Sequence, residues 1–225
     1  MGGFERYFPN LAERVPEFIK SILDTLRMTA ISGVFIFIIG IIFGVMLIVT
    51  KEGGILENRI VYHIADKLIN ALRSIPFIIL ISLLLPVTRA IVHTSIGVKG
   101  AIVPLVVGTV PFFSRQVEAA LAQIDGGVIE AAKSMGMHPA NVIFKVYLRE
   151  GIPGLARATT ITAINLIGLT AMAGAVGAGG LGDFAIRYGH NRYMTDITIA
   201  TTAVLIVLVC IIQIIGSFIA GRATH

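Results

Sequence analysis

The hydrophobic and polar positions divide the chain into long apolar runs separated by shorter polar segments. Residues 28–50, 158–182 and 197–221 contain no charged side chain over 23, 25 and 25 residues. A helix of about 20 apolar residues crosses the hydrocarbon core of a bilayer. Each of these runs therefore predicts one membrane-spanning helix.

Two further apolar runs are shorter and carry prolines. Residues 74–88 and 100–114 are each uncharged over 15 residues, and each contains two prolines. The pattern predicts a second membrane helix that begins within residues 64–74 and ends near residue 88, and a third over residues 100–114, which makes five. Prolines at membrane depth free backbone groups that need partners, so the two runs fit either kinked bundle helices or the broken helices of a substrate path.

An amphipathic segment precedes the first apolar run. Apolar residues recur there at helical spacing, while charged residues fill the other face. The apolar set is Phe4, Phe8, Leu11, Val15, Phe18, Ile19, Ile22, Leu23 and Leu26. The spacing predicts an interfacial amphipathic helix over residues 1–27, interrupted near Pro9 and Pro16, ahead of a transmembrane domain over residues 28–222. The helix is either a simple lead-in or an arm that contacts a partner.

The composition supports an all-α integral membrane protein. Apolar residues make up 56% of the chain and charged residues only 14%, against about 25% charged residues in soluble proteins. The net charge of +5 comes from cations that flank apolar runs, so we expect membrane lipid and no nucleic acid as a partner. The single cysteine, Cys210, excludes an intrachain disulfide, and the histidines lack metal-ligand spacing.

A polar segment between the third and fourth apolar runs carries a short helix-prone stretch, residues 130–136. We expect Ala131, Ala132 and Met135 to share one small apolar face, while the charged and hydroxyl side chains beside them stay in water. Gly136 supplies the residue that most easily takes the left-handed conformation of a helix cap.

A second short helix is predicted to follow the first. Pro139 suits its first turn, the helix covers residues 140–148, and Gly151 and Pro153 end it. The two helices together predict a compact cytosolic helix–turn–helix over about residues 125–150.

This stretch resembles the EAA loop of ABC-importer permeases, in which Glu-Ala-Ala is followed by three residues and glycine. In that family the short helix docks into a groove of a separate ATP-hydrolysing subunit. The ATPase-coupling residues implied by the resemblance are Glu130, Ala131, Ala132, Met135 and Gly136. Val146 and Leu148 fit the continuation of the family pattern, whereas Arg149 stands where a proline is usual, which affects the exit path from the loop more than the docking helix.

Three more stretches, residues 73–80, 94–105 and 171–182, look like the permease subunit of bacterial methionine importers. The resemblance covers nearly the whole chain from about residue 20. It implies a homodimer with one translocation path at its two-fold axis and alternating access in the bacterial inner membrane. It also implies two copies of an ABC ATPase subunit, which hold ATP and Mg, and an extracytoplasmic methionine-binding lipoprotein. No cofactor is expected on this chain.

The translocation gate of that family falls on Met172. A flexible thioether can plug a narrow apolar path, although a lone methionine in a membrane helix more often packs in a core. The implied gate and substrate-path residues are Met172, Asn165, Pro76, Gly174 and Gly177. Asn165 and Gln213 are also simple candidates for interhelical hydrogen bonds.

Glycines 177, 179 and 182 match the spacing of a dinucleotide-binding fingerprint. That fingerprint has meaning only between a strand and a helix, and here it ends a membrane span. The glycines instead predict a bend or a close approach of backbones.

Orientation follows from the loop. If residues 125–150 are cytosolic, five helices place the N-terminus outside and the C-terminus in the cytoplasm, with ten cations inside and eight outside. The chain has no phosphate-binding loop and no paired catalytic acids, so it is not expected to be an enzyme. The alternatives are a permease for another small amino acid and, in a different class, a passive channel or membrane scaffold.

Overall fold

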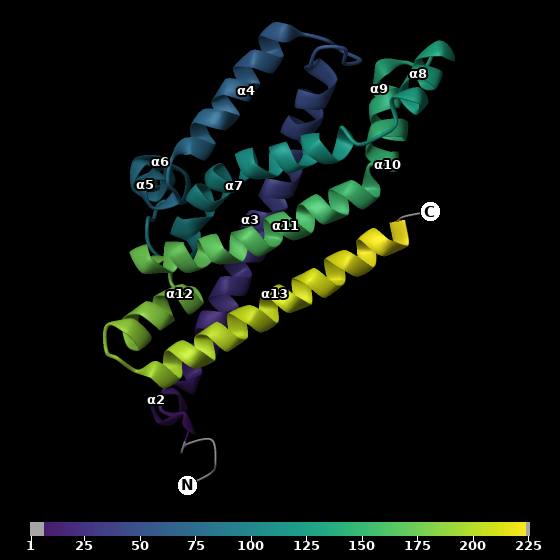
Figure 1. Ribbon diagram of the computed structural model, residues 1–225. Helices are drawn as coiled ribbons and strands as arrows, with labels where there is room; N and C mark the ends of the chain where they lie inside the picture. The colour runs from purple at the N-terminus through teal and green to yellow at the C-terminus, as the bar shows by residue number, and fades with distance from the viewer. Residues whose placement is uncertain (1–6, 224–225) are drawn as a thin grey trace. The chain divides into compact units, whose positions relative to one another are not determined.

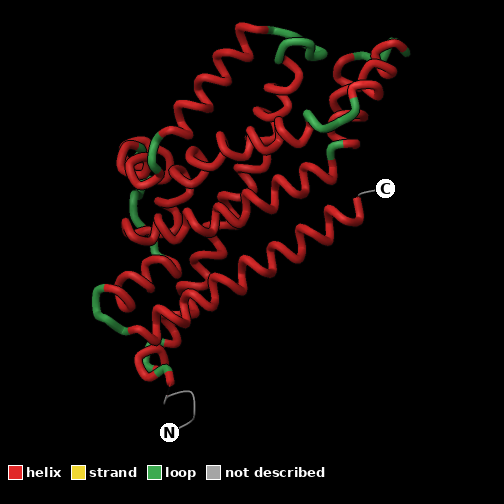
Figure 2. The backbone as a smooth tube through the Cα atoms, in the orientation of Figure 1, coloured by secondary structure: helices red, strands yellow, loops and turns green. Residues whose placement is uncertain are grey.

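The computed structural model describes residues 7–223, which are helical nearly throughout and contain no strand (Figures 1 and 2). The helices are α2 Pro9–Ala12, α3 Val15–Thr50, α4 Arg59–Ser74, α5 Phe77–Leu83, α6 Leu85–Val92, α7 Gly97–Leu121, α8 Gly126–Ser134, α9 Pro139–Val142, α10 Leu148–Glu150, α11 Ile152–Ala173, α12 Gly180–Phe184 and α13 Thr195–Ala223. Three π-helical stretches, η1 Ile143–Tyr147, η2 Gly174–Ala178 and η3 Ala185–His190, lie among them. The predicted all-α membrane class is confirmed.

Within residues 7–223, four helices are long and apolar enough to cross a membrane: Val15–Thr50, Gly97–Leu121, Ile152–Ala178 and Thr195–Ala223. The second predicted membrane helix, which ends near residue 88, is not one continuous helix, and of the two interpretations left open for this run the broken helix holds. Ile75 precedes Pro76 and is extended, with φ −83° and ψ 121°, because proline disfavours the helical conformation of the residue before it. Pro86 then lies in the first turn of the separate helix α6.

The third predicted span is longer than expected. Pro104 and Pro111 lie inside α7, which runs without interruption over Gly97–Leu121. The predicted third membrane helix is confirmed, and of the two interpretations left open for this run the continuous bundle helix holds rather than the broken helix.

The amphipathic segment near the N-terminus continues directly into the first apolar run. Pro9 is the first residue of α2 and Pro16 lies in the first turn of α3, positions where a missing N–H costs no helical hydrogen bond. The predicted interruption near the two prolines is confirmed, and α3 then passes residue 27 without a break. Phe4, the first apolar residue of the predicted helix, lies outside the described residues.

The chain forms two compact units, and the four long helices contribute residues to both. Unit 1 comprises residues 1–34, 76–107 and 163–212. Its core includes Leu11, Phe184, Tyr188 and Ile197. The Asp196 carboxylate accepts hydrogen bonds from the backbone and side chain of Asn10, at 2.9 and 3.0 Å, and so holds α2 to the start of α13.

Unit 2 comprises residues 35–75, 108–162 and 213–225. Leu47 of α3 packs with Ala65 and Ile69 of α4 in a buried cluster. α3 also packs tightly on α7, because a Cβ at Gly40 or Gly44 would overlap the side chain of Phe113 or Val117. Small residues at such contacts let membrane helices approach closely.

Candidate coupling and transport sites

Helix α8 is short and capped at both ends. The Asp125 side chain accepts a hydrogen bond from the Gly127 N–H at 2.8 Å. At the other end Gly136 has φ +71°, its N–H donates to the Lys133 carbonyl at 2.9 Å, and the Met137 N–H donates to the Ala132 carbonyl at 3.1 Å. These two bonds form a Schellman motif. The predicted glycine cap is confirmed.

One side of α8 presents an apolar stripe. Val128 is 44% exposed and Met135 is 74% exposed, and the exposed Ala131 lies between them at helical spacing. The prediction that Ala132 shares this face is wrong, because Ala132 is only 3% exposed and lies on the inner side of the helix. Val128 was not predicted and completes the stripe.

Glu130 lies on the opposite side of α8 from this stripe and is exposed. Within residues 7–223 it forms no ion pair. Its carboxylate is thus free for a cation on a partner, and that role stays a prediction.

The second half of the coupling loop is a helix with an irregular centre. His138 Nδ1 accepts a hydrogen bond from the Ala140 N–H at 3.3 Å and caps α9. The helix continues as the π-helical η1 and ends with α10, after which Gly151 separates it from α11. The predicted position of this helix and its termination are confirmed. Arg149 simply continues the helix in α10, at the place where the family pattern has proline.

The two halves of the loop pack on each other, since α8 contacts both α9 and η1 (Figure 1). Val142, Val146 and Tyr147 are buried, and burial raises the pKa of the Tyr147 phenol. Phe144, by contrast, is 68% exposed. Sequence analysis missed Phe144, although a large aromatic residue in a polar segment was a usable signal.

Helix α11 and the η2 stretch that continues it carry an exposed stripe in unit 1. Asn165, Gly168, Met172 and Ala175 are all exposed, at alternating spacings of three and four residues that define one face of a helix. Met172 is 43% exposed, so it does not pack in a core of this chain. The structure thus brings the two side chains proposed for the path, Asn165 and Met172, onto one open surface.

The remaining polar candidate, Gln213, bonds within its own helix. Its Nε2 donates to Ser217 Oγ at 3.4 Å within α13, and the interhelical bond expected for Gln213 stays a prediction. Pro76 belongs to unit 1 but lies in the turn before α5, in a segment separate from α11.

The glycine-rich end of α11 is a sharp turn. Gly177, Gly179 and Gly180 have φ of +92°, +79° and +79°, a region that residues with a side chain rarely adopt. The Leu181 N–H donates to Thr25 Oγ1 of α3 at 2.8 Å and fixes the turn to that helix. The predicted bend is confirmed.

Two buried glycines let α12 contact the end of α11 and the η2 stretch through the backbone. A Cβ at Gly174 would overlap the N–H of Asp183, and a Cβ at Gly182 would overlap the Ala171 carbonyl. Gly174 therefore has a packing reason for being glycine, independent of any role in the path.

We expect Gly182→Ala to destabilise the folded protein by about 3 kcal/mol, because the added methyl group meets backbone rather than a movable side chain. Thermal unfolding of the detergent-purified protein measures this loss. Gly221→Ala is the matched control, since a Cβ there meets nothing within 4 Å. Equal melting temperatures for the two variants would contradict the close approach.

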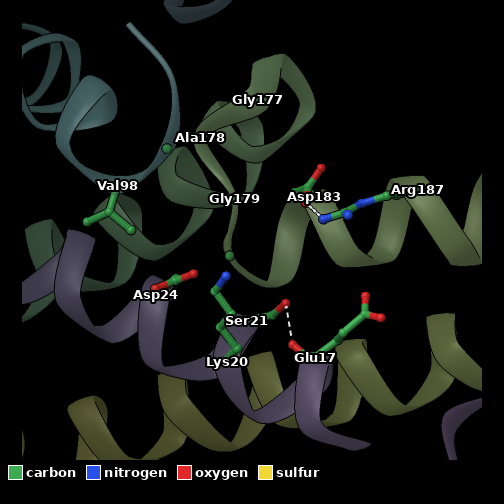
Figure 3. Close-up of a pocket in the computed structure, with 12 residues that line it drawn as sticks. Glu17, Lys20, Ser21, Asp24, Val98, Gly177, Ala178, Gly179, Asp183 and Arg187 are labelled. Atoms are coloured by element: carbon green, nitrogen blue, oxygen red, sulfur yellow. Dashed lines mark hydrogen bonds and ion pairs between the residues drawn. The ribbon is translucent and has the colours of Figure 1, made fainter. Parts of the chain in front are cut away.

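A pocket of about 380 Å³ lies in unit 1 beside the glycine turn (Figure 3). It is lined by Glu17, Lys20, Ser21, Asp24, Gly97, Val98, Gly177, Ala178, Gly179, Gly180, Asp183 and Arg187. Of these only Gly177 was a predicted path residue. Arg187 donates to the Asp183 carboxylate. Burial lowers the pKa of Arg187, but the interactions with Asp183, Tyr188 and Glu17 together outweigh burial, and the pKa is raised.

A cluster of charged and polar side chains in unit 2 was also missed. Arg115 of α7 pairs with Asp66 of α4 and, at 2.7 Å, with Glu118, and it also donates to the Asn70 side chain. The two partner carboxylates are 28% and 15% exposed. The sequence gives no signal for this contact, because Asp66 and Arg115 are 49 residues apart.

Comparison with known proteins identifies the family of this chain. The chain matches the family described as "Binding-protein-dependent transport system inner membrane component" over residues 36–224. The probable D-methionine transport system permease protein MetI of Vibrio cholerae is 47% identical over 202 residues, which cover 90% of each chain. The methionine import system permease protein MetP of Bacillus subtilis is 46% identical over 218 residues, which cover 97% of each chain.

A solved structure agrees with these relatives. It is described as an inward-facing conformation of the MetNI methionine ABC transporter, and one of its chains superposes with a TM-score of 0.93 at 45% identity. The match covers 95% of this chain and 99% of that chain.

The spanning helices and the capped loop thus define a membrane-embedded transport component rather than an enzyme. The chain belongs to the family of binding-protein-dependent transport system inner membrane components. Its similarity to the permeases of methionine importers extends over nearly its full length, which confirms the resemblance seen in the three sequence stretches.

Proposed function

We propose that this chain is the permease subunit of an ATP-driven importer for methionine and close analogues in the bacterial inner membrane. The observation that carries the proposal is α8, a helix capped at both ends that exposes Val128, Ala131 and Met135 to solvent. A small apolar stripe on a rigid helix outside the spanning segments suits docking into a partner groove. The methionine permeases to which the chain is similar support the choice of substrate.

The assembly we propose is a homodimer with two ABC ATPase subunits and an extracytoplasmic methionine-binding lipoprotein. ATP and Mg belong to the ATPase subunits, and this chain carries no cofactor. The N-terminus is outside and the C-terminus in the cytoplasm, which makes α8 cytoplasmic. Residues 1–27 form the interfacial segment and residues 28–222 the permease domain.

This orientation requires a fifth crossing of the membrane. We assign it to α4 together with the short helices α5 and α6, which the turn at Pro76 interrupts. Interrupted helices are tolerated at membrane depth where they line a cavity or are covered by protein. They are also a frequent feature of transporter binding sites.

The mechanism is alternating access. ATP binding draws the two ATPase subunits together, the docked α8 helices follow them, and the spanning helices rock between inward-open and outward-open arrangements. A coupler of this kind has to move as a rigid body. The Schellman motif and the packing of α8 on α9 and η1 supply that stiffness.

The translocation path runs along the exposed stripe of α11. Met172 and Asn165 face it, and the turn at Gly174 and Gly177 ends it. A thioether at the narrowest point is soft and adaptable, and it suits a substrate that is itself a thioether.

The test is reconstitution of this chain in proteoliposomes with its ATPase and binding protein, followed by uptake of labelled methionine with and without ATP. Uptake that requires ATP and the ATPase supports the proposal. Uptake without ATP would identify a passive channel. ATP-dependent uptake of another amino acid, with no competition by methionine, would support the permease function and show that methionine is not the substrate.

We expect Met172→Ala to raise ATP hydrolysis in the absence of methionine by about threefold to tenfold. Removing the thioether opens the gate and lowers the barrier between the two states by roughly 1 kcal/mol. Phosphate release from the assembled complex measures this rate, with Met46→Ala, in the other unit, as the control. Unchanged ATP hydrolysis in the absence of methionine would contradict the role of Met172 as the gate.

A further inference from the structure

The pocket beside the glycine turn has the features of a binding site for a small charged molecule. Its volume of about 380 Å³ lies within the range of roughly 300–1,000 Å³ that small-molecule sites occupy. Three glycines and Ala178 form one wall, so no large side chain fills the space. A Cβ at Gly179 would reach Asp24 Oδ2 at 3.9 Å, which shows how near that wall lies to the charged groups opposite.

The charges that line the pocket are of both signs. Three carboxylates and two cations contribute: Glu17, Asp24, Asp183, Lys20 and Arg187. Most of them have partners. Glu17 Oε2 accepts a hydrogen bond from the Tyr188 hydroxyl at 2.7 Å, Asp183 pairs with Arg187, and Asp24 pairs with Arg27 at 3.5 Å.

Lys20 differs from these groups. Within residues 7–223 its ammonium group forms no hydrogen bond or ion pair, and Figure 3 shows its side chain reaching toward the Gly179 wall with Asp24 beside it. The pocket therefore offers one free cation next to carboxylates that can accept further hydrogen bonds. A carboxylate oxygen has several acceptor sites, so a pairing with one arginine leaves capacity for another donor.

We propose that this pocket binds the zwitterionic head group of a free α-amino acid, with the α-carboxylate on Lys20 and the α-ammonium between Asp24 and Asp183. Val98 and Ala178 supply the apolar surface for the first carbons of the side chain. Lys20 is the one lining charge without a partner within residues 7–223, and the carboxylates of Asp24 and Asp183 keep acceptor sites beyond their arginine partners, so both charged groups of a zwitterion find a partner here. The amino acid class rests on the proposed function; the neighbouring anion-binding and cation-binding groups are a feature of the pocket itself.

In the proposed orientation residues 17–24 lie at the outer end of α3. The pocket is then a site on the extracytoplasmic side, and it adjoins the end of the path, because Gly177 is one of its lining residues. It would hold an amino acid released from the binding protein before the path opens to it.

The experiment measures equilibrium binding of labelled methionine to the nucleotide-free permease–ATPase complex without the binding protein. We expect Lys20→Met to weaken binding roughly tenfold, the loss of one charged hydrogen bond. Val98→Phe, which fills the cavity without changing any charge, should do the same. Lys99→Met is the control, because Lys99 is an exposed lysine of the same unit that does not line the pocket.

A ligand series separates a zwitterion site from a simple ion site. Norleucine keeps both charges and should compete with methionine, while the desamino analogue and methionine methyl ester, which each lack one charge, should not. Competition by either single-charge analogue, wild-type affinity in Lys20→Met, or no binding to the wild-type complex would overturn the proposal. Loss of ATP-dependent uptake with this binding pattern intact would instead count against the importer function.

Discussion

Ala131→Arg is expected to abolish ATP-dependent methionine uptake while leaving the membrane protein folded. Ala131 lies in the middle of the exposed stripe of α8, where its methyl group leaves room for close contact with a partner. A guanidinium there must either be buried unpaired or hold the surfaces apart. A buried unpaired charge costs about 3 kcal/mol or more, roughly a hundredfold in affinity for the ATPase.

The measurements are copurification of the ATPase and uptake in proteoliposomes. Because Ala131 is exposed and contributes little to the packing of the chain, the melting temperature and the oligomeric state of the variant permease should match those of the wild type. Lys133→Glu is the matched control, since it makes a larger change in charge on the opposite face of the same helix. Full uptake by Ala131→Arg, or equal loss in Lys133→Glu, would show that the stripe is not the docking surface.

Gly136→Trp tests the cap and not the surface, so it is the weaker probe. Gly136 has φ +71°, which an L-residue rarely adopts, and a Cβ there meets nothing within 4 Å. A substitution at Gly136 therefore strains the Schellman motif and loosens α8 without blocking the stripe. Its effect on uptake would mix the loss of stiffness with the loss of docking.

Local signals in the sequence were sufficient for much of the coupling loop. The cap at Gly136, the start of the second helix at Pro139 and the stop at Gly151 all depend on backbone preferences of single residues, which act within one turn. Burial depends on partners instead. Ala132 was placed on the exposed face because helical spacing alone does not say which side of a short helix packs on α9 and η1.

Composition predicts where apolar runs lie, but backbone chemistry decides whether one run forms one helix. An apolar run of 15 residues predicts a span, but Pro76 and Pro86 divide it into helices that are each too short to cross alone. The run in α7 also carries two prolines, but Pro104 and Pro111 lie within an unbroken helix, which is the other interpretation that the sequence left open. The number of prolines is equal in the two runs, so proline count alone does not decide whether a helix breaks.

The pocket and the Arg115 cluster could not be predicted from the sequence, because both depend on tertiary contacts. Both combine residues from segments far apart in the chain, and none of the charged side chains occurs in a recognisable motif. From the sequence, Lys20 and Asp24 belong to the solvent-exposed face of an interfacial helix. In the structure they line a pocket together with the glycine turn. Their role becomes visible only with the contact between Thr25 and Leu181.

Arg115→Met is expected to lower the stability of the protein by about 3 kcal/mol, because it leaves the largely buried carboxylates of Asp66 and Glu118 without their cation. The loss of stability comes from leaving two carboxylates unpaired, and not from losing the attraction between the ions. The triple variant Arg115→Met, Asp66→Asn, Glu118→Gln should therefore regain most of the stability, although it lacks every ion pair of the cluster. Thermal unfolding of the two purified variants decides the matter: a triple variant as unstable as Arg115→Met would mean that the arginine side chain acts through packing alone.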